Sequence, residues 1–154
     1  MKAMLTIALA LISATAMAAT TGTLNLSGVV STVYSIVVNG NAAATSLDII
    51  GGESATLIAS VDETSNNAGG YKIRASSANN GQLKNGSVDQ VSYQVSYDNG
   101  SNVSLSTSMA DLKSSGSLAG LVTDSSDVKI TFSGHPSAAA GTFSDTITFE
   151  IAAP

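Results

Sequence analysis

The stretch that decides the fold is Ala140–Pro154, which reads "AGTFSDTITFEIAAP". Its even positions from 142 to 150 are threonine, serine and glutamate, and its odd positions are mostly apolar: Phe143, Asp145, Ile147, Phe149 and Ile151. This two-residue period predicts a strand with one apolar and one polar face. Asp145 is the exception on the apolar face, so we expect it either to lie beyond the packed region or to pair with a neighbour. An alternating strand at the edge of a sheet invites pairing with another strand.

The opening residues predict export. The stretch "MKAMLTIALALISATAMAAT" has Lys2, an apolar run over residues 4–12, and small residues at positions 16 and 18 that fit a cleavage site. We therefore expect residues 1–18 to be a secretory signal peptide and the mature chain to begin at Ala19. The alternative is a membrane anchor, but the apolar run is short for a span. No later stretch predicts one, so we expect no membrane span after signal cleavage.

Composition narrows the class of protein. Removal of residues 1–18 leaves roughly 136 residues, enough for one domain. The formal charge is -5, and loss of Lys2 makes it about -6 by counting. Such an acidic chain is a poor nucleic-acid partner, because nucleic acid attracts clustered cations. Only 11% of residues are charged and no cysteine is present, so disulfides are excluded. Low charge with many small polar residues is typical of exported β proteins.

Short alternating segments fill the mature chain, and clusters rich in Gly, Asn and Ser separate them. Strands are expected at 22–30, 33–38, 55–61, 71–76, 91–97, 103–107 and 128–133, followed by the closing strand. Asn39-Gly40 predicts a turn after the second of these strands. Strands of this length and spacing predict an all-β sandwich or barrel. Only residues 107–121 have room for a helical turn, and their Gly and Ser content argues against a long helix.

One hairpin can be placed by register, in "VSYQVSYDNGSNVSLST". A two-residue loop at 99–100 would set a polar residue opposite Val103. A three-residue loop over 98–100, with Gly100 left-handed, pairs Val95 with Val103 and Tyr93 with Leu105. Register follows the buried face, so we expect the three-residue loop.

Residues that carry chemistry are sparse. His135 is the only histidine, lies in the expected loop "SGHPSA", and is expected to be solvated. Asp62-Glu63, Asp124 and Asp127 have side chains that suit calcium binding or glycoside chemistry, but turn-forming acids are the stronger interpretation. No nucleophile-elbow motif is present. We therefore expect no enzyme activity, no catalytic residue, no metal site and no cofactor.

Three stretches together resemble bacterial chaperone–usher fimbrial subunits, or pilins. They are "ATTGTLNLSGVVSTVYSIVV" at 19–38, "TSNNAGGYKIRASSANNGQL" at 64–83 and "AGTFSDTITFEI" at 140–151. The chain is most similar to the spore coat protein U-like pilins or to a related cysteine-free type. Pilins of the spore coat U-like kind usually carry cysteines, and this chain has none.

The resemblance implies an immunoglobulin-like sandwich that lacks one strand and is completed by donor-strand pairing. In such pilins a periplasmic chaperone fills the groove first, and the N-terminal extension of the next subunit replaces it at the outer-membrane usher. The chain would then consist of a signal peptide (1–18), a donor-strand extension (19–31) and a pilin domain (32–154). The resemblance assigns the donor face to Leu24, Leu26, Gly28 and Val30. It assigns the acceptor edge to Phe143, Ile147, Phe149 and Ile151.

The implied function is that of a shaft or minor subunit of a surface fimbria that supports adhesion or biofilm. Its partners would be identical or related pilins, the chaperone and the usher, and its route would run through the periplasm to the cell surface. The main alternative is a stand-alone secreted or periplasmic binding module on a complete sandwich, in which residues 22–30 pair within their own chain. An enzyme is the third and weakest alternative, because no patterned catalytic residues are present.

Overall fold

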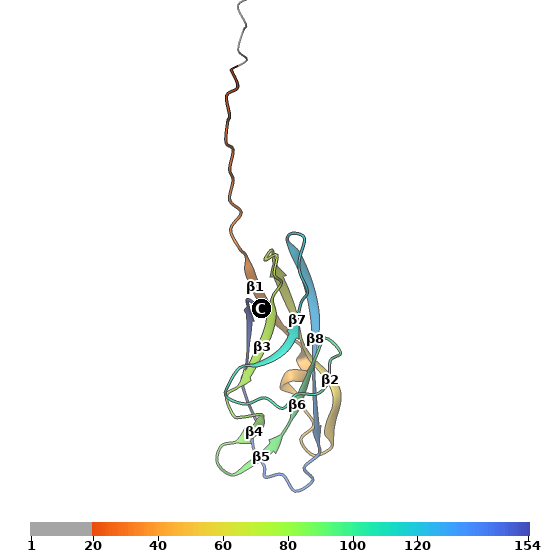
Figure 1. Ribbon diagram of the computed structural model, residues 1–154. Helices are drawn as coiled ribbons and strands as arrows, with labels where there is room; N and C mark the ends of the chain where they lie inside the picture. Colours follow the sequence, from red (N-terminus) through yellow and green to blue (C-terminus); the bar gives the residue numbers. More distant parts are fainter. Residues whose placement is uncertain (1–19) are drawn as a thin grey trace, which may run out of the picture. The chain divides into compact units, whose positions relative to one another are not determined.

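The computed structural model describes residues 20–154 (Figure 1). The expected signal peptide, residues 1–18, and Ala19 lie outside the described residues. The chain divides into two units, one up to Val30 and the other Ser31–Pro154. Residues 20–33 form no strand, and Leu24, Leu26 and Val30 are 83%, 85% and 87% exposed. The strand expected at 22–30 is therefore not part of any sheet. A single extended segment has no ladder of hydrogen bonds without a partner.

The second unit is built almost entirely of strands. Its elements are β1 (Tyr34–Gly40), the short 3-10 helix η1 (Ala42–Thr45), β2 (Gly52–Ser65), β3 (Lys72–Ser77), β4 (Gln82–Asn85), β5 (Asp89–Ser92), β6 (Gln94–Tyr97), β7 (Ala110–Ser114), β8 (Val122–Ser133) and β9 (Ile147–Ala152). The all-β prediction is confirmed.

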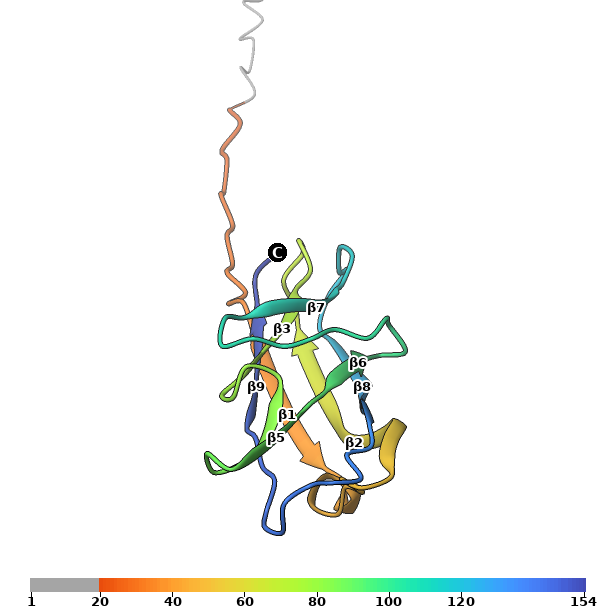
Figure 2. The ribbon, with the colours of Figure 1, turned by 90° about the horizontal axis from the view of Figure 1, so that it is seen from below.

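The strands form a sandwich of antiparallel sheets (Figures 1 and 2). One sheet has the order β1-β2-β8-β6, the other has the order β7-β3-β9, and β4-β5 is a separate hairpin. Alternate side chains of both large sheets point inward and pack together. Val61, Ile73, Val95 and Val128 are the largest apolar side chains with almost no exposed surface. The core lies between the two large sheets.

For residues 91–97, the predicted buried face is confirmed, but the prediction of one continuous strand is wrong. Val91, Tyr93, Val95 and Tyr97 are all buried, as the alternation predicts. The chain nevertheless changes sheet at Tyr93, so that β5 pairs with β4 and β6 pairs with β8. The backbone N–H of Tyr93 donates to the Gly81 carbonyl at 2.9 Å. Periodicity reports the face of a strand and not its partner, which is why the break was not visible.

For the predicted hairpin, the pairing of Val95 with Val103 is confirmed, but the predicted turn geometry is wrong. Val95 and Val103 exchange backbone hydrogen bonds of 2.9 and 2.7 Å. The left-handed residues are Asp98 and Asn99, with φ of 50° and 57°, and Gly100 is not left-handed. Two successive positive φ angles make a type I′ turn, which Asp and Asn tolerate and which fits strand twist. The expected pairing of residues 93 and 105 does not form, because the N–H of residue 93 bonds elsewhere.

Four smaller predictions also fail. Asn39 and Gly40 lie inside β1 rather than in a turn, because β2 extends far enough to pair with them. The helical turn η1 lies at Ala42–Thr45 and not within 107–121, which contain β7 instead. The strand expected at 103–107 is reduced to the isolated bridge at 103. Asp124 and Asp127 lie within β8, which begins at Val122, so they are not turn residues. At residues 39–40 and at Asp124 and Asp127, pairing with a neighbouring strand outweighs the local turn signal.

Candidate functional site: an open seam between two edge strands

The strands β1 and β9 are both edges, and they lie side by side (Figure 2). β1 pairs only with β2, and β9 pairs only with β3. The two strands run in opposite directions, and Cα atoms of one approach those of the other within 8 Å. No ladder joins them. We call this open side of the sandwich, with the side chains that line it, the seam.

The free backbone groups of β9 belong to the residues that also face the core. The Ala78 N–H donates to the Thr146 carbonyl at 2.9 Å, which makes the even positions of this strand the hydrogen-bonded partners of β3. In an antiparallel pair these positions alternate with positions whose N–H and C=O point away. The groups of Ile147, Phe149 and Ile151 therefore face the seam. Their side chains are half-buried against the core.

The same rule applies to β1, on the opposite wall. The Asn41 N–H donates to the Ile58 carbonyl at 2.8 Å, so the odd positions of β1 bond to β2. The even positions then present their backbone groups to the seam. These positions are Tyr34, Ile36, Val38 and Gly40. Among residues 20–154, no strand pairs with these inner backbone groups, so both walls of the seam offer donors and acceptors next to apolar side chains.

A cavity of about 230 Å³ opens into the seam. Its lining is mainly apolar and includes Val38, Leu47, Ile58, Leu83, Ile147 and Phe149. Val38 is 48% exposed, although it lies on the inward face of β1. A second hollow of about 500 Å³ shares the lining residues Leu47, Leu83 and Asp145 with the first. The core is therefore incompletely covered along this side.

Asp145 lies at the meeting point of the two hollows and is fully satisfied by its own chain. Its carboxylate accepts hydrogen bonds from the Ser77 hydroxyl at 2.5 Å and the Tyr93 hydroxyl at 2.6 Å. The backbone N–H groups of Asn79 and Thr146 donate to it at 2.9 and 2.7 Å. Of the two expectations for this residue, pairing with a neighbour is the one observed. Burial, and then the Asp145 carboxylate, raise the pKa of Tyr93 far above its usual range.

The predicted acceptor residues divide into two groups. Ile147, Phe149 and Ile151 lie on the inward face of β9, as expected. Phe143 precedes β9 and lines the second hollow instead. The predicted donor residues lie in no sheet: Leu24, Leu26 and Val30 are largely exposed, and nothing approaches a Cβ built on Gly28 within 4 Å. The two predicted sets belong to different units of the chain.

Sequence reasoning missed the β1 wall. Valines at 33, 37 and 38 place apolar residues on both faces of "VYSIVV", so alternation alone does not choose the inward face. The pairing of β1 with β2 makes that choice.

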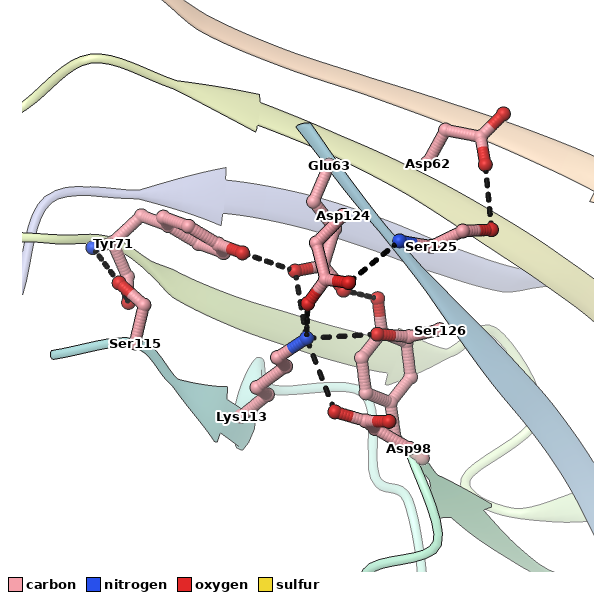
Figure 3. Close-up of polar contacts among 10 residues, drawn as sticks. Asp62, Glu63, Tyr71, Asp98, Lys113, Ser115, Asp124, Ser125 and Ser126 are labelled. Atoms are coloured by element: carbon pink, nitrogen blue, oxygen red, sulfur yellow. Dashed lines mark hydrogen bonds and ion pairs between the residues drawn. The ribbon is translucent and has the colours of Figure 1, made fainter. Parts of the chain in front are cut away.

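A buried polar cluster links the two large sheets (Figure 3). Glu63 on β2 has no exposed surface, and it accepts hydrogen bonds from the hydroxyls of Tyr71 (2.7 Å) and Tyr97. Lys113 on β7 reaches across to it, with Nζ 3.2 Å from Oε2. The same ammonium lies 2.7 Å from Asp124 and 3.1 Å from Asp98. Sequence reasoning missed this cluster, because its members are far apart along the chain.

The charges in this cluster support one another. Burial alone lowers the pKa of Lys113, but hydrogen bonds to Asp124 and Asp98 and the charge of Glu63 outweigh it, so the lysine pKa is raised. The hydrogen bond from Lys113 lowers the pKa of Asp124. Burial, followed by the hydrogen bond to Glu63, raises the pKa values of Tyr71 and Tyr97. These contacts therefore favour the ammonium form of Lys113 over the neutral amine.

His135 lies in a loop, as predicted, but it has a partner. Its Nε2 lies 3.1 Å from Asp89 Oδ1, and the Ala139 N–H donates to Asp89 Oδ2 at 2.8 Å. Asp89 therefore ties the loop that contains His135 to β5. The expectation of a solvated histidine holds only in part, because the side chain is 35% exposed and the rest is covered in this contact.

Within residues 20–154 no group of three or more His, Asp or Glu side chains is arranged to hold a metal ion. No helix in that range is long and apolar enough to cross a membrane. Comparisons with protein-family models, curated proteins and solved structures find no match.

Proposed function

We propose that the chain is a structural subunit of a surface fimbria, assembled when the N-terminal extension of one subunit enters the seam of the next. One observation carries this proposal: on each wall of the seam, the residues whose backbone groups are free also point apolar side chains toward the core. Strand addition needs both features, because main-chain hydrogen bonds give affinity and side-chain pockets give specificity. The domain is then an immunoglobulin-like sandwich that lacks one strand.

The extension, residues 19–31, matches the seam in chemistry and length. None of its side chains is charged, and the α-ammonium that cleavage creates at Ala19 lies five residues before Leu24, so the segment 24–30 carries no charge into an apolar seam. The seven residues 24–30 span about 20 Å when extended, close to the length of β9. Full burial of Leu24, Leu26 and Val30 contributes about 1.5–3 kcal/mol for each side chain. These side chains are exposed in the free chain, so this burial is still available on binding.

The seam must widen when it receives a strand. Two neighbours of an inserted strand lie about 9.5 Å apart, because each hydrogen-bonded spacing is about 4.7–4.9 Å. Cα atoms of β1 and β9 approach within 8 Å, which is less than this separation. The free subunit is therefore partly closed along the seam, and separation of β1 from β9 accompanies insertion.

Two unpaired edges are a liability during export, because exposed strand edges template aggregation. A periplasmic chaperone that lends a strand to the seam, and an outer-membrane usher that exchanges it for the next subunit, meet this need. Signal-peptide cleavage before Ala19 frees the extension. The fimbria then supports adhesion or biofilm at the cell surface.

The test removes the extension and supplies it separately. Light scattering on the processed chain should show polymers, and a chain that lacks residues 19–30 should stay monomeric and folded. A peptide of residues 19–31 added to this truncated chain should raise the Tm of the chain. At a peptide concentration of a hundred times the Kd, the free energy of unfolding should rise by about 2.7 kcal/mol. A processed chain that stays monomeric, together with a truncated chain whose Tm the peptide does not raise, overturns the proposal. A truncated chain that unfolds supports the stand-alone binding module, in which residues 22–30 complete their own sandwich.

A further inference from the structure

The linker Ser31–Val33 has a length that permits the extension to fold back into the seam of its own chain. Hairpin loops of two to five residues are common. A three-residue loop at 31–33 sets position 30 opposite Tyr34, 28 opposite Ile36 and 26 opposite Val38. The apolar face of the extension then points into the core, as it does when the extension enters a neighbour. Length and pattern alone do not distinguish self-pairing from donation.

Asn66, the first residue after β2, holds this linker. The Val33 N–H donates to Asn66 Oδ1 at 2.7 Å, and Asn66 Nδ2 donates to the Ser31 carbonyl at 2.9 Å. The Asn66 N–H also reaches the Val33 carbonyl at 3.4 Å. These bonds continue the β1–β2 pairing by one residue pair. They turn the backbone groups of Ser31 and Val33 toward β2, whereas a folded-back hairpin requires the linker to bend into the seam.

We propose that Asn66 is a positioning residue that favours donation to a second copy of this chain over self-pairing. This inference rests on the proposed function. An asparagine suits the role because its amide supplies one acceptor and one donor, and the linker offers one N–H and one C=O to match them. A chain that folds back must break both side-chain bonds. Without them the linker is free to bend, and the extension reaches its own seam faster than it meets another subunit.

The experiment compares the processed wild-type chain with Asn66→Ala and with the matched control Asn102→Ala. Asn102 lies exposed in a loop and makes no side-chain hydrogen bond within residues 20–154. Hydrogen exchange is measured at the backbone amides of residues 24–30, in monomers diluted below the polymerisation range. Exchange should be fast in the wild type and in Asn102→Ala, and slower by at least about tenfold in Asn66→Ala. At higher concentration Asn66→Ala should form several-fold less polymer in sedimentation.

Further variants identify the cause of each outcome. Asn66→Ala combined with Leu26→Asp should exchange fast again, because a charged residue does not enter the seam. Asn66→Asp keeps the acceptor for Val33 and loses the donor to Ser31, so its exchange should be intermediate. Equal exchange in Asn66→Ala and wild type overturns the inference, as does loss of polymer without slower exchange. Slower exchange in Asn66→Ala, together with a wild type that never polymerises, upholds the role of Asn66 in blocking self-pairing and refutes the fimbrial function.

Discussion

Lys113 and Glu63 belong to opposite sheets, and the lysine Nζ lies 3.2 Å from Oε2 of a carboxylate that has no exposed surface. With Tyr71 and Tyr97 donating to the same carboxylate, every charge in this interior has a partner. Burial of a charge is tolerable only when it is paired and hydrogen-bonded. The pair therefore fixes how the two sheets face each other.

Lys113→Met should destabilise the fold by about 3–5 kcal/mol, because it leaves Glu63 buried without its cation. Adding Glu63→Gln should recover part of this loss, since the neutral amide needs no cation. Urea unfolding of the single and double variants measures both effects. Lys72→Met is the control: its ion pair with Asp111 is exposed, and its loss should cost less than about 1 kcal/mol. Equal effects of the two lysine variants would contradict the structural role of the cluster.

The protein should lose stability in alkali. Burial raises the pKa values of Tyr71, Tyr93 and Tyr97 in the fold, and nearby carboxylates add to the shift. An unfolded tyrosine releases its proton near pH 10, whereas these folded tyrosines keep theirs. Their contribution is therefore complete below about pH 10 and is lost as the pH rises further. Phenolate absorbance should appear together with loss of the folded signal in circular dichroism. Reversible ionisation of these three tyrosines in a folded protein near pH 10 would contradict the prediction.

His135→Ala should lower the Tm by no more than about 4 °C, because its contact with Asp89 is partly exposed.

The backbone N–H of Ala139, followed by the other donors, lowers the pKa of Asp89. The stabilisation by Asp89 is therefore present above its usual pKa and is lost as the pH falls through the lowered value. Asp89→Asn should make thermal stability less dependent on acid than in the wild type. An unchanged acid profile in that variant would count against the loop anchor.

Leu26→Asp should abolish polymers, and Asn25→Asp should preserve them. Both variants add one negative charge to the extension, but alternation places position 26 on the face that enters the seam and position 25 on the other face. A charge in a dry apolar pocket costs far more than the lost methyl contacts. Light scattering at matched concentrations compares them. Equal polymer yields from the two variants would show that this face does not insert.

The sequence predicted the inward faces well and the pairing partners poorly. Alternation identified Ile147, Phe149 and Ile151, and it identified the buried apolar positions of 91–97, because the pleat ties side-chain direction to sequence parity. It did not identify Ser96, which is buried although it has the opposite parity. It did not reveal the change of sheet at Tyr93 or the left-handed pair that precedes Gly100. Those features depend on hydrogen bonds to residues distant in sequence.

The candidate site was half predicted for the same reason. The closing strand has a clean period, whereas β1 has valines on both faces, so its contribution to the seam emerged only from its register with β2. The cluster around Lys113 joins residues from four strands and the turn at Asp98. No spacing rule connects such positions, because their proximity is a property of the tertiary fold.

The presence of an unpaired strand on each wall of the seam, β1 and β9, also has a mechanical consequence. In the proposed fibre, the inserted strand is hydrogen-bonded to β1 on one side and to β9 on the other, and all three strands lie along one direction. Tension on the strand acts along its own axis and so loads both rows of hydrogen bonds in shear. The bonds of both rows must yield together rather than one after another. A fibre built in this way resists pulling without any covalent cross-link, which suits a chain that has no cysteine.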